Sequence, residues 1–274
     1  MTLKVRNRIL QFFLVFSCAC ITSALICFII ALINKAITPP PVFRVPAVLS
    51  KTPLLNYSFT ATMLSISLLV IFAPVAAWHL MKFFQATQAS EVIFFMAFLT
   101  ACLFEGLRFL TPLFGLWATF SDFLFFCGRL LFMCRLLAPL SFVFAALASS
   151  ADQRQEIERN ITVLFAVCIV FSVIAPINTA KITSAGTITW GFSKLFLVSR
   201  LIFIVIAFIS FWINSKNNEE PDYAKMGIYM LVMLAGYGFM ITADNFVFMI
   251  MGMPLLVYGC VKYLKTLHQI YLWK

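Results

Sequence analysis

Long apolar runs separated by short polar segments make up almost the whole chain. A helix needs about 20 apolar residues to cross a bilayer, and eight runs come close to that length. The predicted spans cover residues 9–33, 59–80, 91–111, 120–148, 161–177, 190–213, 226–243 and 245–262. We therefore expect an all-α, polytopic transmembrane helix bundle in which residues 1–274 form a single integral membrane domain, with no soluble domain.

The first and last apolar runs decide the number of spans. The first follows a basic collar and is longer than the apolar core of about 7–15 residues in a signal peptide, so we interpret it as an uncleaved span. A single helix over residues 226–261 would be about 54 Å long, too long for one crossing, so we predict two spans with a tight turn at Asp244 and Asn245. Seven spans are the alternative, if the first run is removed or the last pair is re-entrant.

The connections between the runs indicate the orientation in the membrane. Residues 34–56 are rich in proline, which helix interiors exclude, so we expect an extended external loop there. Of the 20 Lys and Arg residues, eleven fall on the side of the two termini, five on the opposite side and four inside spans. Because cytoplasmic loops are enriched in Lys and Arg, we expect both termini in the cytoplasm, with a bacterial-type cytoplasmic membrane as the favoured location.

Composition supports the membrane assignment and narrows the partners. The chain is 63% hydrophobic and only 11% charged, against roughly 25% charged in soluble proteins. Its net charge of +10 is dispersed over loops and span ends, so we interpret it as a topology signal and as contact with anionic membrane lipids. A basic stripe interleaved with aromatic residues, typical of nucleic-acid binding, is missing.

The sequence offers little chemistry for an enzyme. Eight cysteines lie in apolar runs without a C-x-x-C pair, so free buried thiols are expected rather than a metal or redox site. The sequence contains neither H-E-x-x-H nor G-x-S-x-G, and its embedded acidic residues are too few for a two-metal site. We expect a non-enzymatic protein without a cofactor.

Charged residues inside the apolar runs are the strongest indication of a functional site. Ionised groups are costly in hydrocarbon, and those that occur there commonly serve a function. The candidate ligand-binding residues are Arg129, Arg200, Arg135, Glu105, Arg108 and Asp122.

Part of this set is expected to pair within the chain. The third and fourth spans run antiparallel, and comparison of depths would place Glu105 opposite Arg129 and Arg108 opposite Asp122. Asp122 also fits a helix N-terminal capping box. Arg135 lies about 120° around its helix from Arg129 and should point elsewhere.

The remaining imbalance leads to the functional hypotheses. Four embedded arginines face two embedded acids, and a guanidinium matches a carboxylate or phosphate with two hydrogen bonds. We expect a receptor-like protein that binds a small anionic or lipid ligand in an outward-facing cavity, and signals through a cytoplasmic or membrane protein partner. A transporter, or the membrane subunit of a transport complex, is the first alternative. A scaffold subunit of a membrane complex is the second alternative. The embedded charges could also be explained without a ligand, if the arginines reach water or the backbone carbonyls near Pro139 and Pro176.

Overall fold

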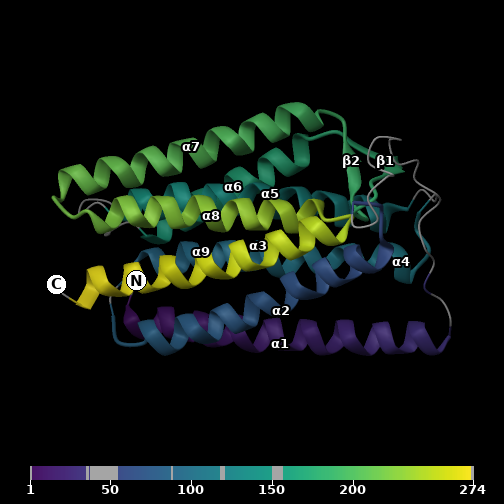
Figure 1. Cartoon of the computed structure of the whole chain (residues 1–274), viewed down its shortest axis with the longest axis horizontal. Coiled ribbons are helices and arrows are strands. Elements are labelled where there is room, and N and C mark those ends of the chain that lie inside the picture. Colours follow the sequence, from purple (N-terminus) through teal and green to yellow (C-terminus); the bar gives the residue numbers. More distant parts are fainter. Residues whose placement is uncertain are drawn as a thin grey trace.

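The structure is a computed structural model that describes residues 2–34, 37, 55–87, 89–117, 121–149 and 157–272. Within these ranges eight helices are long and apolar enough to cross a membrane, which confirms the predicted all-α transmembrane bundle. The two ends of the chain lie at the same end of the bundle, here called the terminal end, and a β-hairpin lies at the opposite hairpin end (Figure 1). Most of the predicted external loop 34–56 lies outside the described residues.

The helices follow the predicted order with shifted ends. The spans are α1 (Leu3–Ile33), α2 (Phe59–Phe84), the span of α3 to α4 (Glu91–Leu113), α5 (Asp122–Ala148), α6 (Ile157–Ile174), α7 (Ser193–Asn217), α8 (Asp222–Thr242) and α9 (Phe246–Leu272). The largest shift is in α9, which was expected to end near residue 262. Its last turns bury Tyr263, Leu267 and Ile270, so the helix continues as an amphipathic segment after the uniformly apolar run has ended.

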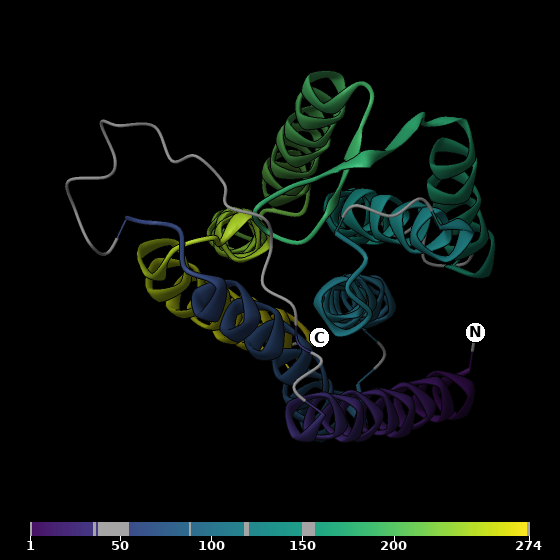
Figure 2. The same ribbon diagram turned by 90° about the vertical axis from the view of Figure 1, so that its right-hand side faces the viewer.

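The helix α5 is the centre of the bundle. In its most apolar stretch 78% of the residues are buried, against 11% in α1 and 17% in α7. It packs against α3, α6 and α7, so charged side chains on α5 can reach several helices. Viewed along the bundle, α1 lies at its edge, and α6 and α7 stand apart from each other with the hairpin between them (Figure 2).

The third span is interrupted at the level of its charged residues. The helix α3 (Glu91–Phe104) passes into a 3-10 helix, η1 (Glu105–Phe109), before the short α4 (Leu110–Leu113). A Cβ on Gly106 would lie 2.9 Å from Val70 Cγ2, so η1 approaches α2 closely. In a 3-10 helix residues three apart are eclipsed, and Glu105 and Arg108 therefore stack on one face.

Close contact of α8 with α9 depends on glycine. A Cβ on Gly259 would lie 2.6 Å from the Met233 backbone nitrogen, and one on Gly236 would lie 2.8 Å from the Gly252 carbonyl oxygen. Small residues allow helix backbones to approach in the absence of a hydrophobic driving force in lipid. The predicted turn at Asp244 and Asn245 separates the two helices, as expected.

A β-hairpin replaces the loop expected between the fifth and sixth spans. Strand β1 (Ile177–Ile182) pairs antiparallel with β2 (Ile188–Trp190), with a register irregularity between Asn178 and Ile182. Gly186 in the turn has a φ of 72°, a conformation that glycine adopts without strain. Ile182 and Ile188 pack against Leu124 of α5, so the hairpin is attached to the bundle by its apolar side chains.

Candidate functional site

Glu105 is the centre of a buried ion cluster near the hairpin end. Its side chain is fully buried, and Arg135 of α5 donates to both of its oxygens, from Nε to Oε1 at 2.7 Å and from Nη2 to Oε2 at 2.9 Å. Arg108 donates to Oε2 at 3.4 Å, and the Tyr237 hydroxyl of α8 donates to Oε1 at 3.2 Å. One carboxylate therefore connects η1, α5 and α8.

The hairpin turn covers this cluster. Arg108 donates from Nε to the Ala185 carbonyl at 2.8 Å and also reaches it with Nη2. The hydroxyl of Ser184 donates to Asp244 Oδ2 at 2.9 Å, which fixes the turn to the connection between α8 and α9. The turn therefore lies over the charged cluster and is held from two sides.

The expected pairing of the charged residues is wrong. Arg129 does not meet Glu105: it donates to the carbonyls of Ser172, at 3.0 Å, and of Val173, both near the C-terminal end of α6. Cations are favoured at that end of a helix, so the charge of Arg129 is accounted for within the chain and needs no ligand. Asp122 does not meet Arg108: it lies exposed at the start of α5, and its side chain forms no hydrogen bond or ion pair with any described residue.

The reason for this difference is the direction in which each arginine points. Arg129 and Arg135 both belong to α5, and a separation of six residues turns them about 120° apart. As predicted they point to different partners, but it is Arg135 that faces Glu105, while Arg129 faces α6. Depth along the helices was the basis of the expected pairs, and depth does not specify the face.

Arg200 of α7 is the arginine of the set that has neither a counter-charge nor a hydrogen-bond acceptor among the described residues. The buried residues of α7 are Phe196, Ala207 and Phe211, and at 3.6 residues per turn Arg200 lies in the middle of that face. Its Nε is buried and has no hydrogen-bond partner among the described residues. The guanidinium carbon lies 5.7 Å from the centre of the Phe196 ring.

Arg200 belongs to the same electrostatic environment as the Glu105 cluster. It interacts electrostatically with Tyr237, Arg135 and Glu105. Three guanidiniums, from Arg108, Arg135 and Arg200, thus lie within electrostatic reach of the Glu105 carboxylate. Because Arg135 and Arg108 already occupy Glu105, the cluster retains an excess of positive charge at Arg200.

Aromatic side chains surround the two arginines. The Trp190 ring lies 5.3 Å from the Arg135 guanidinium carbon and contacts the rings of Phe132 and Phe196 at 5.4 and 5.1 Å. Its indole N–H is buried and has no acceptor among the described residues. Two unpaired buried donors, on Trp190 and Arg200, therefore lie against the same Phe196 ring.

The unpaired polar groups of this arrangement are hydrogen-bond donors, on Arg200 and Trp190. Among the described residues no group of three or more His, Cys, Asp and Glu side chains could hold a metal ion. Arginine and indole N–H groups donate hydrogen bonds and do not accept them. A carboxylate or phosphate oxygen is the complement of such a set.

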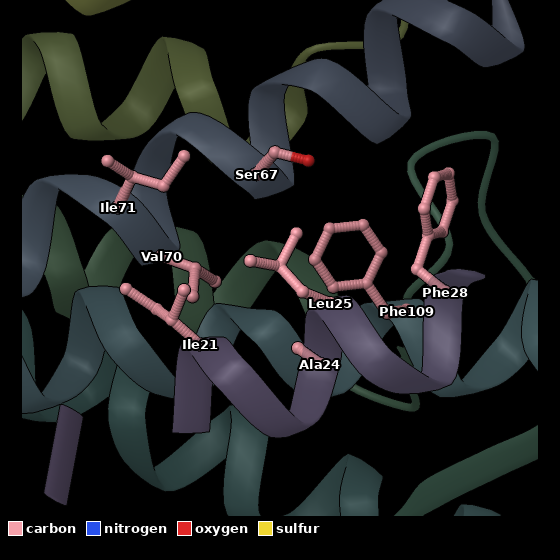
Figure 3. A pocket seen from close by; sticks show the side chains of 8 residues that line it. All are labelled: Ile21, Ala24, Leu25, Phe28, Ser67, Val70, Ile71 and Phe109. Atoms are coloured by element: carbon pink, nitrogen blue, oxygen red, sulfur yellow. The ribbon is translucent and has the colours of Figure 1, made fainter. Parts of the chain in front are cut away.

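A separate apolar cavity of about 150 Å³ lies between α1 and α2 (Figure 3). It is lined by Ile21, Ala24, Leu25, Phe28, Ser67, Val70, Ile71 and Phe109. The Ser67 hydroxyl is the one polar side-chain group in this lining. The cavity is therefore not part of the arginine cluster.

The sequence did not indicate three of the groups at this site. Tyr237 lies in an apolar run, Trp190 was placed at the start of a span, and Ala185 contributes its backbone carbonyl from a segment expected to be a loop. A signal for Tyr237 exists, since a buried tyrosine needs a hydrogen-bond partner for its hydroxyl.

Comparisons of the chain with protein-family models, with curated proteins and with solved structures found no match.

Proposed function

We propose that this protein is a receptor-like, non-enzymatic membrane protein that binds an anionic ligand at Arg200. The observation that carries the proposal is the Arg200 guanidinium, whose Nε is buried without an acceptor among the described residues and which interacts electrostatically with a cluster that is already positively charged. A buried charge without a partner is strongly destabilising. A carboxylate or phosphate would supply both the counter-charge and the hydrogen bonds.

The paired residues support the site. Glu105 holds Arg135 with two hydrogen bonds, and Arg135 in turn lies under Trp190. Rigid support of this kind keeps a binding group in place before the ligand arrives, which lowers the cost of binding. Glu105, Arg108, Arg135 and Tyr237 are therefore positioning residues, whereas Arg200, together with the Trp190 indole N–H, contacts the anion.

The position of the site agrees with an outward-facing ligand. Arg200 is seven residues after Ser193 at the start of α7, about 10 Å along the helix from the hairpin end. The bias of Lys and Arg toward the terminal end supports a cytoplasmic location for both termini. The hairpin end, and with it the site, would then face outward from a cytoplasmic membrane of the bacterial type.

A transporter is the second candidate, and the interruption of the third span favours it. A 3-10 segment within a helix often marks a hinge, and η1 carries two of the clustered charges, Glu105 and Arg108. Transporters bind substrates at interrupted helices near the middle of the membrane. Movement at η1 would change the Glu105 contacts and so the charge that faces Arg200.

Binding and flux measurements separate these functions. The purified protein is titrated with acetate, laurate and inorganic phosphate, and the same probes are followed in liposomes. We expect at least one anion to bind wild type and to be lost in Arg200→Gln, while Lys194→Gln, an exposed charge on the same helix, retains binding.

Flux then distinguishes the two candidates. Binding without flux supports the receptor, and flux abolished in Arg200→Gln supports the transporter. Absence of binding for every anion, with a membrane protein copurifying, would refute the proposal and support a scaffold.

A further inference from the structure

Arg200 lies beside an uncovered apolar flank of α7. Leu197 and Leu201 are 55% and 52% exposed, and they lie about 60° and about 100° around the helix from Arg200, on the same side of it. Arg200 itself is partly exposed, while its Nε is buried. The guanidinium is therefore at the boundary between the bundle interior and a surface that faces lipid.

The neighbouring helix α8 does not cover this flank. At the terminal end α8 approaches α7 closely, where a Cβ on Gly227 would lie 3.2 Å from Phe211 Cβ and 3.3 Å from a Phe208 ring atom. Toward the hairpin end the two helices diverge (Figure 1). The exposed side chains of Leu197 and Leu201 lie in this half of α7, so this flank of α7 is left for the lipid to contact.

The route to Arg200 from the hairpin end is covered, unlike the route from the lipid. The hairpin turn is held over the cluster by Arg108, which donates to the Ala185 carbonyl, and by Asp244, which accepts from Ser184. On the same side Trp190 packs over Arg135. Among the described residues, the path from the hairpin end is thus covered by hydrogen-bonded chain, whereas the path from the lipid is lined by aliphatic side chains.

We infer that the ligand is an anionic amphiphile, with a carboxylate or phosphate head on Arg200 and an apolar chain along the Leu197 and Leu201 flank between α7 and α8. This inference rests on the proposed function and narrows its ligand class. The charge of the head complements the unpaired guanidinium, and the chain stays in the hydrocarbon from which it enters. Such a ligand never has to bring its apolar part through water or its charge through the covered end.

The test compares head groups with and without a chain. Wild-type protein in nanodiscs of phosphatidylcholine, a zwitterionic lipid without net charge, is titrated with laurate, dodecyl phosphate, dodecanol, acetate and inorganic phosphate, with empty nanodiscs subtracted. We expect laurate, dodecyl phosphate or both to bind at least about tenfold more tightly than the matching short anion, and dodecanol not to compete. Whichever of laurate and dodecyl phosphate binds more tightly shows whether the site prefers a carboxylate or a phosphate head group.

Substitutions locate the two parts of the ligand. Arg200→Gln should weaken binding of the chain-bearing anion by about 10- to 100-fold, the value of a hydrogen bond to a charged group. Leu201→Trp should weaken it by obstructing the flank, whereas Val198→Trp, on the outer face of the same helix, should not. Arg200→Lys keeps the charge and serves as the conservative variant. The size-exclusion profile of each variant shows whether a loss of ligand binding reflects misfolding.

Each outcome decides a different point. Equal affinity for acetate and laurate, or for inorganic and dodecyl phosphate, would overturn the amphiphile while leaving anion binding intact. Binding of dodecanol as tight as that of laurate would also overturn it, because the head would then not be recognised. If none of the anions binds, both this inference and the proposed function fail.

Discussion

Replacement of Glu105 by glutamine should destabilise the protein more than any other single charge removal. The change keeps the size of the side chain and removes the charge that receives four donors, two from Arg135 and one each from Arg108 and Tyr237. Hydrogen bonds between membrane helices average about 0.6 kcal/mol, which accounts for roughly 2 kcal/mol. Leaving buried guanidiniums without their counter-charge adds to this, so the expected loss is about 3–5 kcal/mol.

The chain provides a matched control for this prediction. Asp222 and Lys225 form an ion pair with the same 2.7 Å distance as Glu105 and Arg135, but their side chains are 35% and 58% exposed. Asp222→Asn should therefore cost no more than about 1 kcal/mol. Unfolding of both variants by SDS in mixed micelles measures the two free energies side by side.

A double replacement checks that the effect belongs to the pair. Glu105→Leu with Arg135→Met removes both charges, and should cost at least about 1 kcal/mol less than the sum of the two single changes. Equal losses for Glu105→Gln and Asp222→Asn, or strict additivity in the double variant, would refute the assignment of Glu105 as the centre of the cluster.

The remaining predictions concern packing, the unpaired arginine and one titrating group. Gly259→Ala should cost about 1–3 kcal/mol through overpacking, whereas Gly238→Ala, where a Cβ meets nothing within 4 Å, should be neutral in thermal unfolding. Arg200→Met should stabilise the ligand-free protein by about 1–3 kcal/mol in SDS unfolding, and a loss instead would show that the chain itself satisfies this guanidinium. Arg129→Gln should leave anion binding unchanged in the same titrations, because α6 carbonyls hold Arg129. Burial, together with the nearby Asp244 carboxylate, raises the pKa of Tyr57 to about 12. Since the pKa of tyrosine in the unfolded chain is about 10, the contribution of Tyr57 to stability is complete below pH 10 and is lost as the pH rises to 12. Tyr57→Phe should remove this pH dependence from the unfolding free energy.

The spans could be predicted because lipid imposes a simple requirement on sequence. Every backbone polar group must be satisfied within the segment, so a long apolar run becomes a helix. The division of residues 226–261 into α8 and α9 followed from the length of the run and from the polar residues Asp244 and Asn245 within it. Helix ends were less predictable, as in α9, because amphipathic turns continue beyond the uniformly apolar run.

The pairing of charges could not be predicted because it depends on which faces meet. The embedded residues were identified from the sequence, but Arg135 rather than Arg129 faces Glu105, and Arg108 reaches a backbone carbonyl of a hairpin that was expected to be a loop. The hairpin was missed because its strands are short and polar residues separate its few apolar ones. Backbone acceptors such as the Ala185 carbonyl leave no trace in residue type.

Native mass spectrometry of the gently solubilised protein tests most directly whether Arg200 is neutralised by an anion from outside the chain. We expect a bound anionic species on wild type and on Lys194→Gln that is lost from Arg200→Met. A wild-type protein that carries no such species, or a species that Arg200→Met retains equally, would contradict an external anion at Arg200.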